Sequence, residues 1–385
     1  MNTISFEAME KSPMDIVGAL DFDRRDKGIS PRRLPAWTRP QVPEFMNVMV
    51  RMPSGVRLAF STNATCIELE VLTTRMQTPP QALRPIAFDL SIDHDTIISQ
   101  SYEGGNTIVL NPEVPGEFEL KRGSGYTVRF EGLAETEKDC ELWLPANVFL
   151  ELRSFAINAG AILNPPRKSN RHRWVHHGSS ISHCIEAKTP TGTWPAVAAR
   201  LGGVDLRNLG FGGNCHLDPF VARTIRDQPA DRISLKVGIN IVNMDSMRER
   251  VFEPALHGFL DTIREGKPDT PILVVSPIFC PSAEDTPGPT VPGADGKFKT
   301  LPGHEALRVG SMSLSRMREI IETIIEARRK AGDLHLSYLN GLDLFGPDDA
   351  GDLPDDLHPN PAGYIRIGER FNRTVFAPGG IWNHH

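Results

Sequence analysis

Residues 271–278, PILVVSPI, are almost entirely apolar. Such a run is typical of a strand that is buried on both faces, as in a parallel sheet with helices on either side. Strongly amphipathic helical patterns flank it at residues 246–265 and 314–330. In the first of these the apolar positions fall near one face, namely Met247, Val251, Leu256, Phe259, Leu260 and Ile263. The stretch therefore predicts a strand of an α/β domain.

The same alternation extends outward in both directions. Further strands are predicted at residues 173–177, 204–211, 232–238 and 335–341. Further helices are predicted at residues 193–201, 218–227 and 360–371. Thr193 and Asp218 are candidate N-caps, each with a proline in the turn that follows. Repeated strand–helix units predict a doubly wound, flavodoxin-like parallel sheet, in which functional sites lie at the carboxyl ends of the strands.

Residues 45–158 follow a different pattern, in which apolar and polar residues alternate with a period of two. About eight such segments are separated by turn sequences such as Gly104-Gly105 and Gly123-Ser124-Gly125. This spacing predicts an antiparallel, jelly-roll-like β-sandwich. A polar linker with two prolines, NPPRKSNRH, follows at residues 164–172. We therefore predict a leader plus sandwich domain over residues 1–165 and an α/β domain over residues 170–385.

Composition limits the classes of function. The chain has 385 residues, of which 39% are hydrophobic and 23% charged, as expected for a globular protein of two domains. Its net charge of −6 argues against a nucleic-acid partner, since no basic stripe is present to neutralise phosphates. The basic segment from Arg24 to Arg33 is interpreted as a solvated leader, because it also contains Asp26.

No run approaches the roughly 18 apolar residues of a membrane span. The N-terminal sequence MNTISFEAMEKSPMD lacks the pattern of a secretory signal. A cytoplasmic location is therefore expected. The five cysteines are odd in number and scattered without a C-x-x-C pair, which argues against a disulfide framework or a thiolate zinc site.

Two segments could supply a nucleophile and its base. His176-His177-Gly178-Ser179-Ser180-Ile181-Ser182 follows the first predicted strand of the α/β half. A serine hydroxyl needs a base within hydrogen-bond reach, and that base needs an orienting partner. Asp355-Asp356-Leu357-His358-Pro359 could provide both, because an aspartate three residues before a histidine can lie on the same side of a tight turn. A plain Ser/Gly loop and a structural Asp–His pair are the alternatives.

Two further segments follow the second and third predicted strands. They are Asn208-Leu209-Gly210-Phe211-Gly212-Gly213-Asn214 and Gly238-Ile239-Asn240. Glycine N–H groups and an asparagine amide can donate hydrogen bonds to the oxyanion of an acyl-transfer intermediate. Each segment alone is compatible with an ordinary turn. All four segments, however, fall on successive carboxyl-end loops of one predicted sheet.

In this chain order the four segments resemble the blocks of the SGNH hydrolases, a group within the GDSL-type esterases and lipases. HGSSIS points to Ser180, NLGFGGN to Gly213, VGIN to Asn240, and DDLHP to Asp355 and His358. Ser179 stands where that family usually has aspartate, and G-I-N-I replaces the usual G-T-N-D.

The resemblance spans roughly residues 173–376. It implies a Ser180–His358–Asp355 triad, with an oxyanion hole formed by the N–H groups of Ser180 and Gly213 and the side chain of Asn240. No metal or organic cofactor is expected for such chemistry.

The expected function is a serine esterase that hydrolyses a carboxylic ester through an acyl-enzyme. A sandwich ahead of the catalytic domain resembles some carbohydrate esterases, which implies deacetylation of a sugar or of another small acylated molecule. An acyltransferase or a thioesterase with the same triad is an alternative. A non-catalytic carbohydrate-binding or ligand-binding protein is an alternative of another class, with Trp37, Trp143 and Trp174 as stacking or, more simply, core residues. A homo-oligomer is left open.

Three other features have competing interpretations. His176, His177, His183 and His216 could bind a metal, but they lack a suitable spacing and are expected to contact loops. Cys184 is a rival nucleophile or a small buried hydrophobe. Residues 279–310 lack periodicity and are interpreted as a lid or substrate-binding loop, with a disordered insertion as the alternative.

Overall fold

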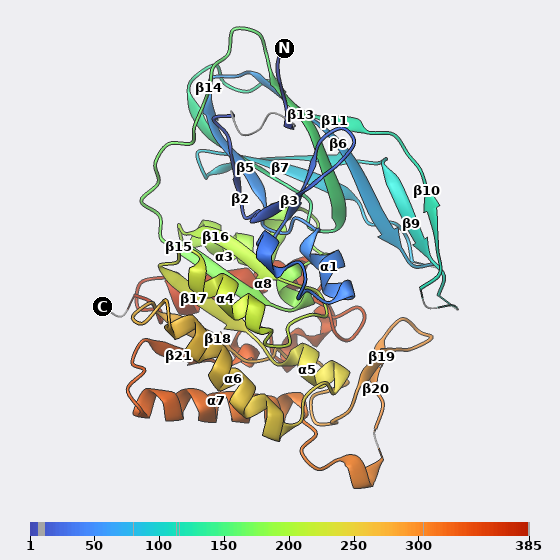
Figure 1. Cartoon of the computed structure of the whole chain (residues 1–385), viewed down its shortest axis with the longest axis vertical. Coiled ribbons are helices and arrows are strands. Elements are labelled where there is room, and N and C mark those ends of the chain that lie inside the picture. The colour runs from blue at the N-terminus through green and yellow to red at the C-terminus, as the bar shows by residue number, and fades with distance from the viewer. Residues whose placement is uncertain (7–11, 80, 113, 115, 303, 384–385) are drawn as a thin grey trace. The chain divides into compact units, whose positions relative to one another are not determined.

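The computed structural model describes residues 1–6, 12–79, 81–112, 114, 116–302 and 304–383 (Figure 1). It divides into two compact units. The sandwich unit comprises Met1–Pro40, Asn47–Asn170 and Ala187–Thr191. The α/β unit comprises Gln41–Met46, Arg171–Glu186 and Gly192–His385. Residues 41–46 are thus part of the α/β unit although the sequence on both sides of them belongs to the sandwich unit. Conversely, residues 187–191 are part of the sandwich unit although the sequence on both sides of them belongs to the α/β unit.

The sandwich unit contains two sheets in its described part. The first has the strand order β10-β9-β6-β13-β4-β3, with β1 beside β13 and β11 beside β6. The second has the order β14-β5-β12-β7-β8, with β2 beside β5. The strands of the first sheet are β1 Asn2–Ser5, β3 Asp21–Arg24, β4 Ile29–Arg32, β6 Cys66–Gln77, β9 Asn106–Leu110, β10 Phe118–Lys121, β11 Tyr126–Glu131 and β13 Val148–Ile157. Those of the second are β2 Asp15–Val17, β5 Arg57–Thr62, β7 Ile86–Ile92, β8 Thr96–Tyr102, β12 Lys138–Trp143 and β14 Leu163–Asn164.

The two sheets share one hydrophobic core. Residues of both sheets form a single buried cluster, in which the rings of Phe60 and Phe155 lie 5.0 Å apart. Side chains along β6 alternate between buried and half-buried, as the period of two predicts. The antiparallel sandwich is thus confirmed, except that β6 and β9 pair in parallel. The jelly-roll connectivity stays a prediction.

The interpretation of the basic segment from Arg24 to Arg33 as a solvated leader is wrong for its second half. Arg24 and Arg25 are exposed, whereas Arg32 and Arg33 are buried, and the segment contains β4, which pairs with β3. Arg33 donates hydrogen bonds to the carbonyl oxygens of Met49 and Met52, and Arg32 donates to Asn47 and Asp23. These bonds to carbonyl, amide and carboxylate oxygens offset the cost of burying the two cations. Residues 7–11 lie outside the described part of the chain.

The α/β unit is built on a five-stranded sheet with the order β16-β15-β17-β18-β21. The strands are β15 Arg173–Gly178, β16 Asp205–Gly210, β17 Arg232–Lys236, β18 Ile272–Val275 and β21 Leu336–Leu339. Every adjacent pair is parallel. In sequence order this is 2-1-3-4-5, the flavodoxin-like arrangement, so the predicted fold class is confirmed.

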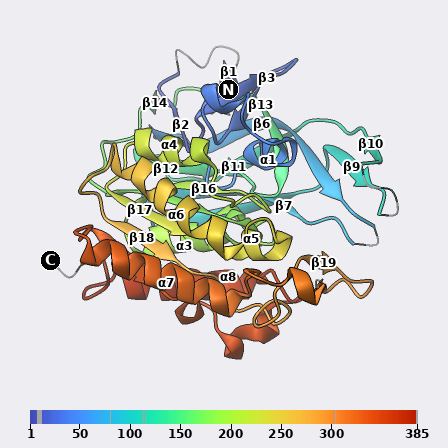
Figure 2. The ribbon, with the colours of Figure 1, turned by 60° about the horizontal axis from the view of Figure 1, so that its bottom comes forward.

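Helices cover both faces of this sheet (Figure 2). The helices are α2 Ser180–His183, α3 Trp194–Leu201, α4 Pro219–Asp227, α5 Ile239–Met244, α6 Glu249–Arg264, α7 Leu314–Lys330 and α8 Pro361–Phe371. On one face, Trp174 of β15 packs against Trp194 of α3 and Phe371 of α8. On the other, His177 of the same strand packs against Phe259 of α6. Residues at an odd separation along a strand point to opposite faces, so these two side chains contact opposite helical layers.

One predicted helix face needs correction. In α6 the buried apolar side chains are Phe252, Leu256, Phe259, Leu260 and Ile263, whereas Val251 is 53% exposed. Phe252 lies four residues before Leu256 on the same stripe, and its larger ring occupies the core.

The segment 279–310 is not a loop throughout. It contains an antiparallel hairpin of β19 Thr290–Pro292 and β20 Phe298–Thr300. Gly303 lies outside the described residues. A disordered insertion is therefore the wrong interpretation of residues 290–300, because their backbone groups pair with one another.

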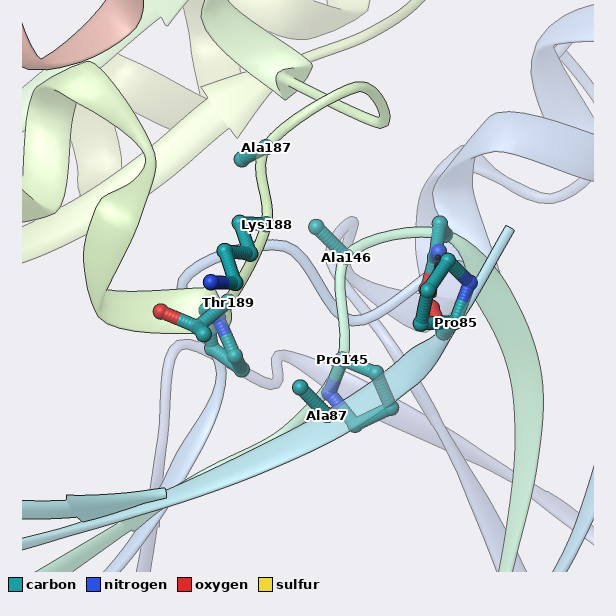
Figure 3. Close-up of a pocket in the computed structure, with 9 residues that line it drawn as sticks. Pro85, Ala87, Pro145, Ala146, Ala187, Lys188 and Thr189 are labelled. Atoms are coloured by element: carbon teal, nitrogen blue, oxygen red, sulfur yellow. Dashed lines mark hydrogen bonds between the residues drawn. The ribbon is translucent and has the colours of Figure 1, made fainter. Parts of the chain in front are cut away.

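The sandwich unit has a small surface hollow that is open to solvent (Figure 3). Its lining is formed by Pro85, Ala87, Pro145, Ala146, Asn147, Ala187, Lys188, Thr189 and Pro190.

Trp143 and Trp174 are buried core residues, while Trp37 is 42% exposed. No helix in the described residues is both long and apolar enough to cross a membrane.

Candidate active site

Ser180 is the first residue of α2, and only Ser179 separates it from the end of β15 at Gly178. Ser179 is the N-cap of this helix, and its buried hydroxyl oxygen accepts a hydrogen bond from the Ile181 N–H at 3.3 Å. Ser179 is thus used to begin the helix, which is the ordinary role of serine at this position. Ser180 remains half-buried at the carboxyl edge of the sheet.

The structure brings Ser180, His358 and Asp355 together. Ser180 Oγ lies 3.0 Å from His358 Nε2, and His358 Nδ1 lies 2.7 Å from Asp355 Oδ2. A carboxylate only accepts hydrogen bonds, so Nδ1 carries the imidazole proton and Nε2 can accept the serine proton. The three residues come from positions 180, 355 and 358, and only the fold places the serine beside the other two.

Asp355 is held in place by its own loop. Its Oδ1 accepts hydrogen bonds from the N–H groups of Leu357 at 3.0 Å and His358 at 2.6 Å. Burial raises the pKa of the Asp355 carboxyl, but the hydrogen bonds and charge of His358 outweigh burial and hold the pKa below its usual value. Asp355 is therefore ionised at neutral pH and can stabilise an imidazolium.

Gly213 and Asn240 lie on the two neighbouring carboxyl-end loops. Gly213 has a φ of +66°, a conformation that favours glycine. Asn240, in the first turn of α5, is 5% exposed, and its Oδ1 accepts a hydrogen bond from the Cys215 N–H at 3.0 Å. This bond orients the amide and leaves its NH2 group as the remaining donor. A second bond, from the Gly212 N–H to His183 Nδ1 at 3.4 Å, connects the Gly213 loop to α2.

The histidines near the site serve as structural contacts. His216 contacts Ser246 Oγ and Gly213 O, and His177 Nδ1 contacts Leu209 O. Within the described residues, no group of three or more His, Cys, Asp or Glu side chains is arranged to hold a metal ion. Cys184 is fully buried, and burial raises the pKa of its thiol well above the usual value, which does not suit a nucleophile.

His176 belongs to a buried hydrogen-bonded chain beneath Ser180. Trp174 Nε1 donates to Ser234 Oγ at 2.8 Å, Ser234 Oγ lies 2.7 Å from His176 Nδ1, and His176 Nε2 lies 2.8 Å from Ser182 Oγ. Both imidazole nitrogens of His176 thus have a serine hydroxyl as hydrogen-bond partner. The chain thus ties α2 to the middle strand of the sheet.

This chain predicts sensitivity to acid. Burial and the nearby positive charges of His177 and Lys236 hold the pKa of His176 well below its usual value of 6.5. Below pH 6.5 the unfolded chain binds a proton that the folded chain rejects, so stability falls with pH in that range. We expect Tm to fall more steeply between pH 6.5 and 5 for the wild type than for His176→Gln. Parallel Tm curves would show that His176 is not the group responsible.

Two residues that contact this site were not predicted from the sequence. Phe298 and Lys297 of the hairpin segment lie against the Asp355–His358 loop. An isolated Lys-Phe pair between turn sequences carries no recognisable motif, and the contact joins residues about sixty positions apart.

The GDSL-like lipase/acylhydrolase family model matches residues 177–366. No curated protein matches the chain significantly. Among solved structures, a salicylyl-acyltransferase from a tetracycline biosynthetic pathway is 28% identical, with a TM-score of 0.81 over 100% of this chain and 99% of its own. A GDSL-like lipase candidate from Bacteroides ovatus is 19% identical, with a TM-score of 0.67 over 96% of this chain and 95% of its own. A family two carbohydrate esterase from Clostridium thermocellum is 14% identical, with a TM-score of 0.58 over 93% and 97%.

The matched region contains all four loops described above. The structural similarities to the two proteins below 25% identity show a shared fold that extends over both units. The chain therefore contains a GDSL-like lipase/acylhydrolase domain over residues 177–366 and is an enzyme of the ester hydrolase type.

Proposed function

We propose that the protein is a serine esterase in which Ser180 is the nucleophile, His358 the general base and acid, and Asp355 the residue that orients His358. The observation that carries this proposal is the continuous hydrogen-bonded line from Ser180 Oγ through His358 to Asp355, at 3.0 and 2.7 Å. Both distances lie within the range that proton transfer requires.

In the first half of the reaction, Ser180 Oγ attacks the ester carbonyl carbon while His358 Nε2 takes its proton. The carbonyl oxygen becomes an oxyanion, which accepts hydrogen bonds from the N–H groups of Ser180 and Gly213 and from Asn240 Nδ2. The C–O bond to the alcohol then breaks, and His358 gives its proton to the leaving oxygen. Ser180 is left as an acyl ester.

In the second half, water replaces the alcohol. His358 takes a proton from the water, whose oxygen attacks the acyl carbon, and the bond to Ser180 Oγ breaks. The carboxylic acid departs and Ser180 recovers its proton. Asp355 stays ionised throughout and stabilises the imidazolium that forms twice in each cycle.

The substrate is proposed to be a small acylated molecule, including an acetylated sugar. The two-unit architecture shared with a family two carbohydrate esterase supports this substrate class. The test is hydrolysis of p-nitrophenyl acetate, butyrate and octanoate, beside acetylated mono- and oligosaccharides. Preference for acetyl over butyryl esters and release of acetate from a sugar would support it. Activity on p-nitrophenyl acetate without activity on any acetylated sugar would support the esterase activity and exclude acetylated sugars as substrates.

Acyl transfer to an alcohol is a second candidate function. The salicylyl-acyltransferase matches this chain over its full length at 28% identity, a higher identity than the esterases show. The same residues would serve, with an acceptor hydroxyl in place of water in the second half of the reaction. Product analysis with competing alcohols separates the two functions, since a transferase forms the new ester even at low acceptor concentration.

Replacing Asn240 tests the oxyanion hole. Asn240→Ala removes a donor to the developing charge and is expected to lower kcat by about 10²–10³-fold with little change in KM. Because Asn240 also fixes the Cys215 N–H, Asn240→Asp is the matched control. It keeps the acceptor but places negative charge beside the oxyanion, so it should be at least as inactive while Tm is retained. Normal kcat in Asn240→Ala would remove Asn240 from the mechanism.

A further inference from the structure

We propose that the β19–β20 hairpin is a clamp that positions His358, with Phe298 also forming the wall beside the leaving alcohol. This inference rests on the proposed function, because it assigns His358 as the proton carrier. It concerns residues 290–300, which none of the four family blocks includes.

The first contact fixes the backbone of the His358 loop. The Phe298 N–H donates to the carbonyl oxygen of Asp355 at 2.8 Å. The next residue, Asp356, has a φ of +62°, which is unfavourable for a residue other than glycine. The hydrogen bond from Phe298 is made to the peptide group just before Asp356, so it stabilises this turn. The turn places the side chains of Asp355 and His358 on the same side of the loop.

The second contact separates the two neighbouring aspartates. Lys297 Nζ lies 3.1 Å from both carboxylate oxygens of Asp356. Asp355 faces His358, whereas Asp356 faces the hairpin. The ion pair is partly exposed, with Lys297 at 49% and Asp356 at 27%, so we assign it a steering role rather than a large contribution to stability.

The third contact is made to the imidazole itself. The rings of Phe298 and His358 lie edge to face, with centroids 5.7 Å apart and planes at 71°. This geometry is favourable for an aromatic pair and restricts rotation of the imidazole about its side-chain bonds. Ser180 and Asp355 form hydrogen bonds with the two nitrogens of the imidazole, and Phe298 adds an aromatic contact to the same ring.

The hairpin also reaches the helix that carries Asn240. Thr290 Oγ1 donates to Asn243 Oδ1 at 3.2 Å, and Asn243 lies in α5, one turn after Asn240. One hairpin thus contacts the loop of the general base and the helix of an oxyanion donor. Movement of this hairpin would alter both, which is the behaviour expected of an element that positions a site.

The position of Phe298 also indicates what it faces in the reaction. His358 Nε2 hands its proton to the leaving alcohol, so a group beside the imidazole lies on the alcohol side of the scissile bond rather than the acyl side. The Phe298 ring is only half-buried and can offer an apolar face to that alcohol. We therefore expect selectivity for alcohols with a flat apolar face, such as aryl groups or sugar rings.

The test compares Phe298→Ala with Phe298→Tyr, which keeps the ring. p-Nitrophenolate leaves without protonation, whereas an alkoxide must be protonated by His358. If Phe298 positions His358, Phe298→Ala should lower kcat for ethyl and benzyl acetate by about 10²-fold, and for p-nitrophenyl acetate by about tenfold or less. Phe298→Tyr should stay within about threefold of the wild type. Val309→Ala, at an 89% exposed position of the same segment, is the control for unspecific effects.

A second measurement does not depend on turnover. The proton between His358 Nδ1 and Asp355 should give a downfield 1H NMR resonance, assigned by its absence in His358→Gln. We expect Phe298→Ala to broaden or shift this resonance and Val309→Ala to leave it unchanged. An unchanged resonance, together with equal losses on both ester types, would overturn the clamp. Wild type and Ser180→Ala are assayed in parallel, because equal activity of these two would contradict the proposed function instead.

Discussion

Ser180→Ala is expected to lower kcat for p-nitrophenyl acetate hydrolysis by about 10⁶-fold, to the residual rate that binding and oxyanion stabilisation provide. The variant lacks the atom that forms the acyl bond, while His358 and Asp355 keep their mutual hydrogen bond at 2.7 Å. Since the lost hydroxyl is small and half-buried, the fold should be preserved. The measurement is steady-state hydrolysis with Tm determined in parallel.

The matched control is Ser179→Ala, one residue away. Ser179 is the buried N-cap of α2 and faces the Ile181 N–H rather than His358. Its loss should cost about 1 kcal/mol of stability, with a far smaller effect on kcat than Ser180→Ala. Exchanged results, with Ser179→Ala inactive and Ser180→Ala active, would show that the nucleophile has been assigned to the wrong serine.

Asp355→Asn is expected to lower kcat by about 10⁴-fold. The amide can still accept the N–H bonds of Leu357 and His358, so the loop should keep its shape. Its NH2 group, however, can donate to Nδ1, which favours the tautomer with the proton on Nε2. That proton blocks the atom that must accept from Ser180, and the imidazolium loses its counter-charge. The measurement is kcat as a function of pH.

Asp356→Asn is the control for this prediction, because the two aspartates are adjacent and only Asp355 contacts His358. We expect a loss of at most about tenfold, since Asp356 acts only through its ion pair with Lys297. If Asp356→Asn were the more damaging change, the carboxylate of the triad would be the other aspartate.

Local patterns in the sequence were sufficient to predict the α/β fold. The apolar stretch 271–278 contains the buried strand β18, Ile272–Val275, and the amphipathic pattern at residues 314–330 has the bounds of α7. The N-terminal strands β1 to β4 were not predicted, because all four are short and β2, β3 and β4 contain charged residues that local patterns assign to solvent. The burial of Arg32 and Arg33 depends on oxygen atoms supplied by residues 47–52, which no local window reveals.

The site was partly predictable for a similar reason. Ser180, Asp355 and His358 lie in short motifs, and parallel-sheet topology brings carboxyl-end loops to one edge. The contacts of Phe298 and Lys297 depend on the fold of an irregular insertion, where neither hydrophobic period nor spacing gives information. The pairing of His176 with Ser182 and Ser234 likewise needs the register of β15 and β17.

The most direct test of the central claim is labelling with a fluorophosphonate, which forms a covalent bond only with an activated serine. After reaction, the protein would be digested and the modified residue located by mass spectrometry. The account predicts stoichiometric labelling of Ser180, none in Ser180→Ala, and strongly slowed labelling in Asp355→Asn. Labelling of Ser179, or equal labelling rates in the wild type and Asp355→Asn, would contradict it.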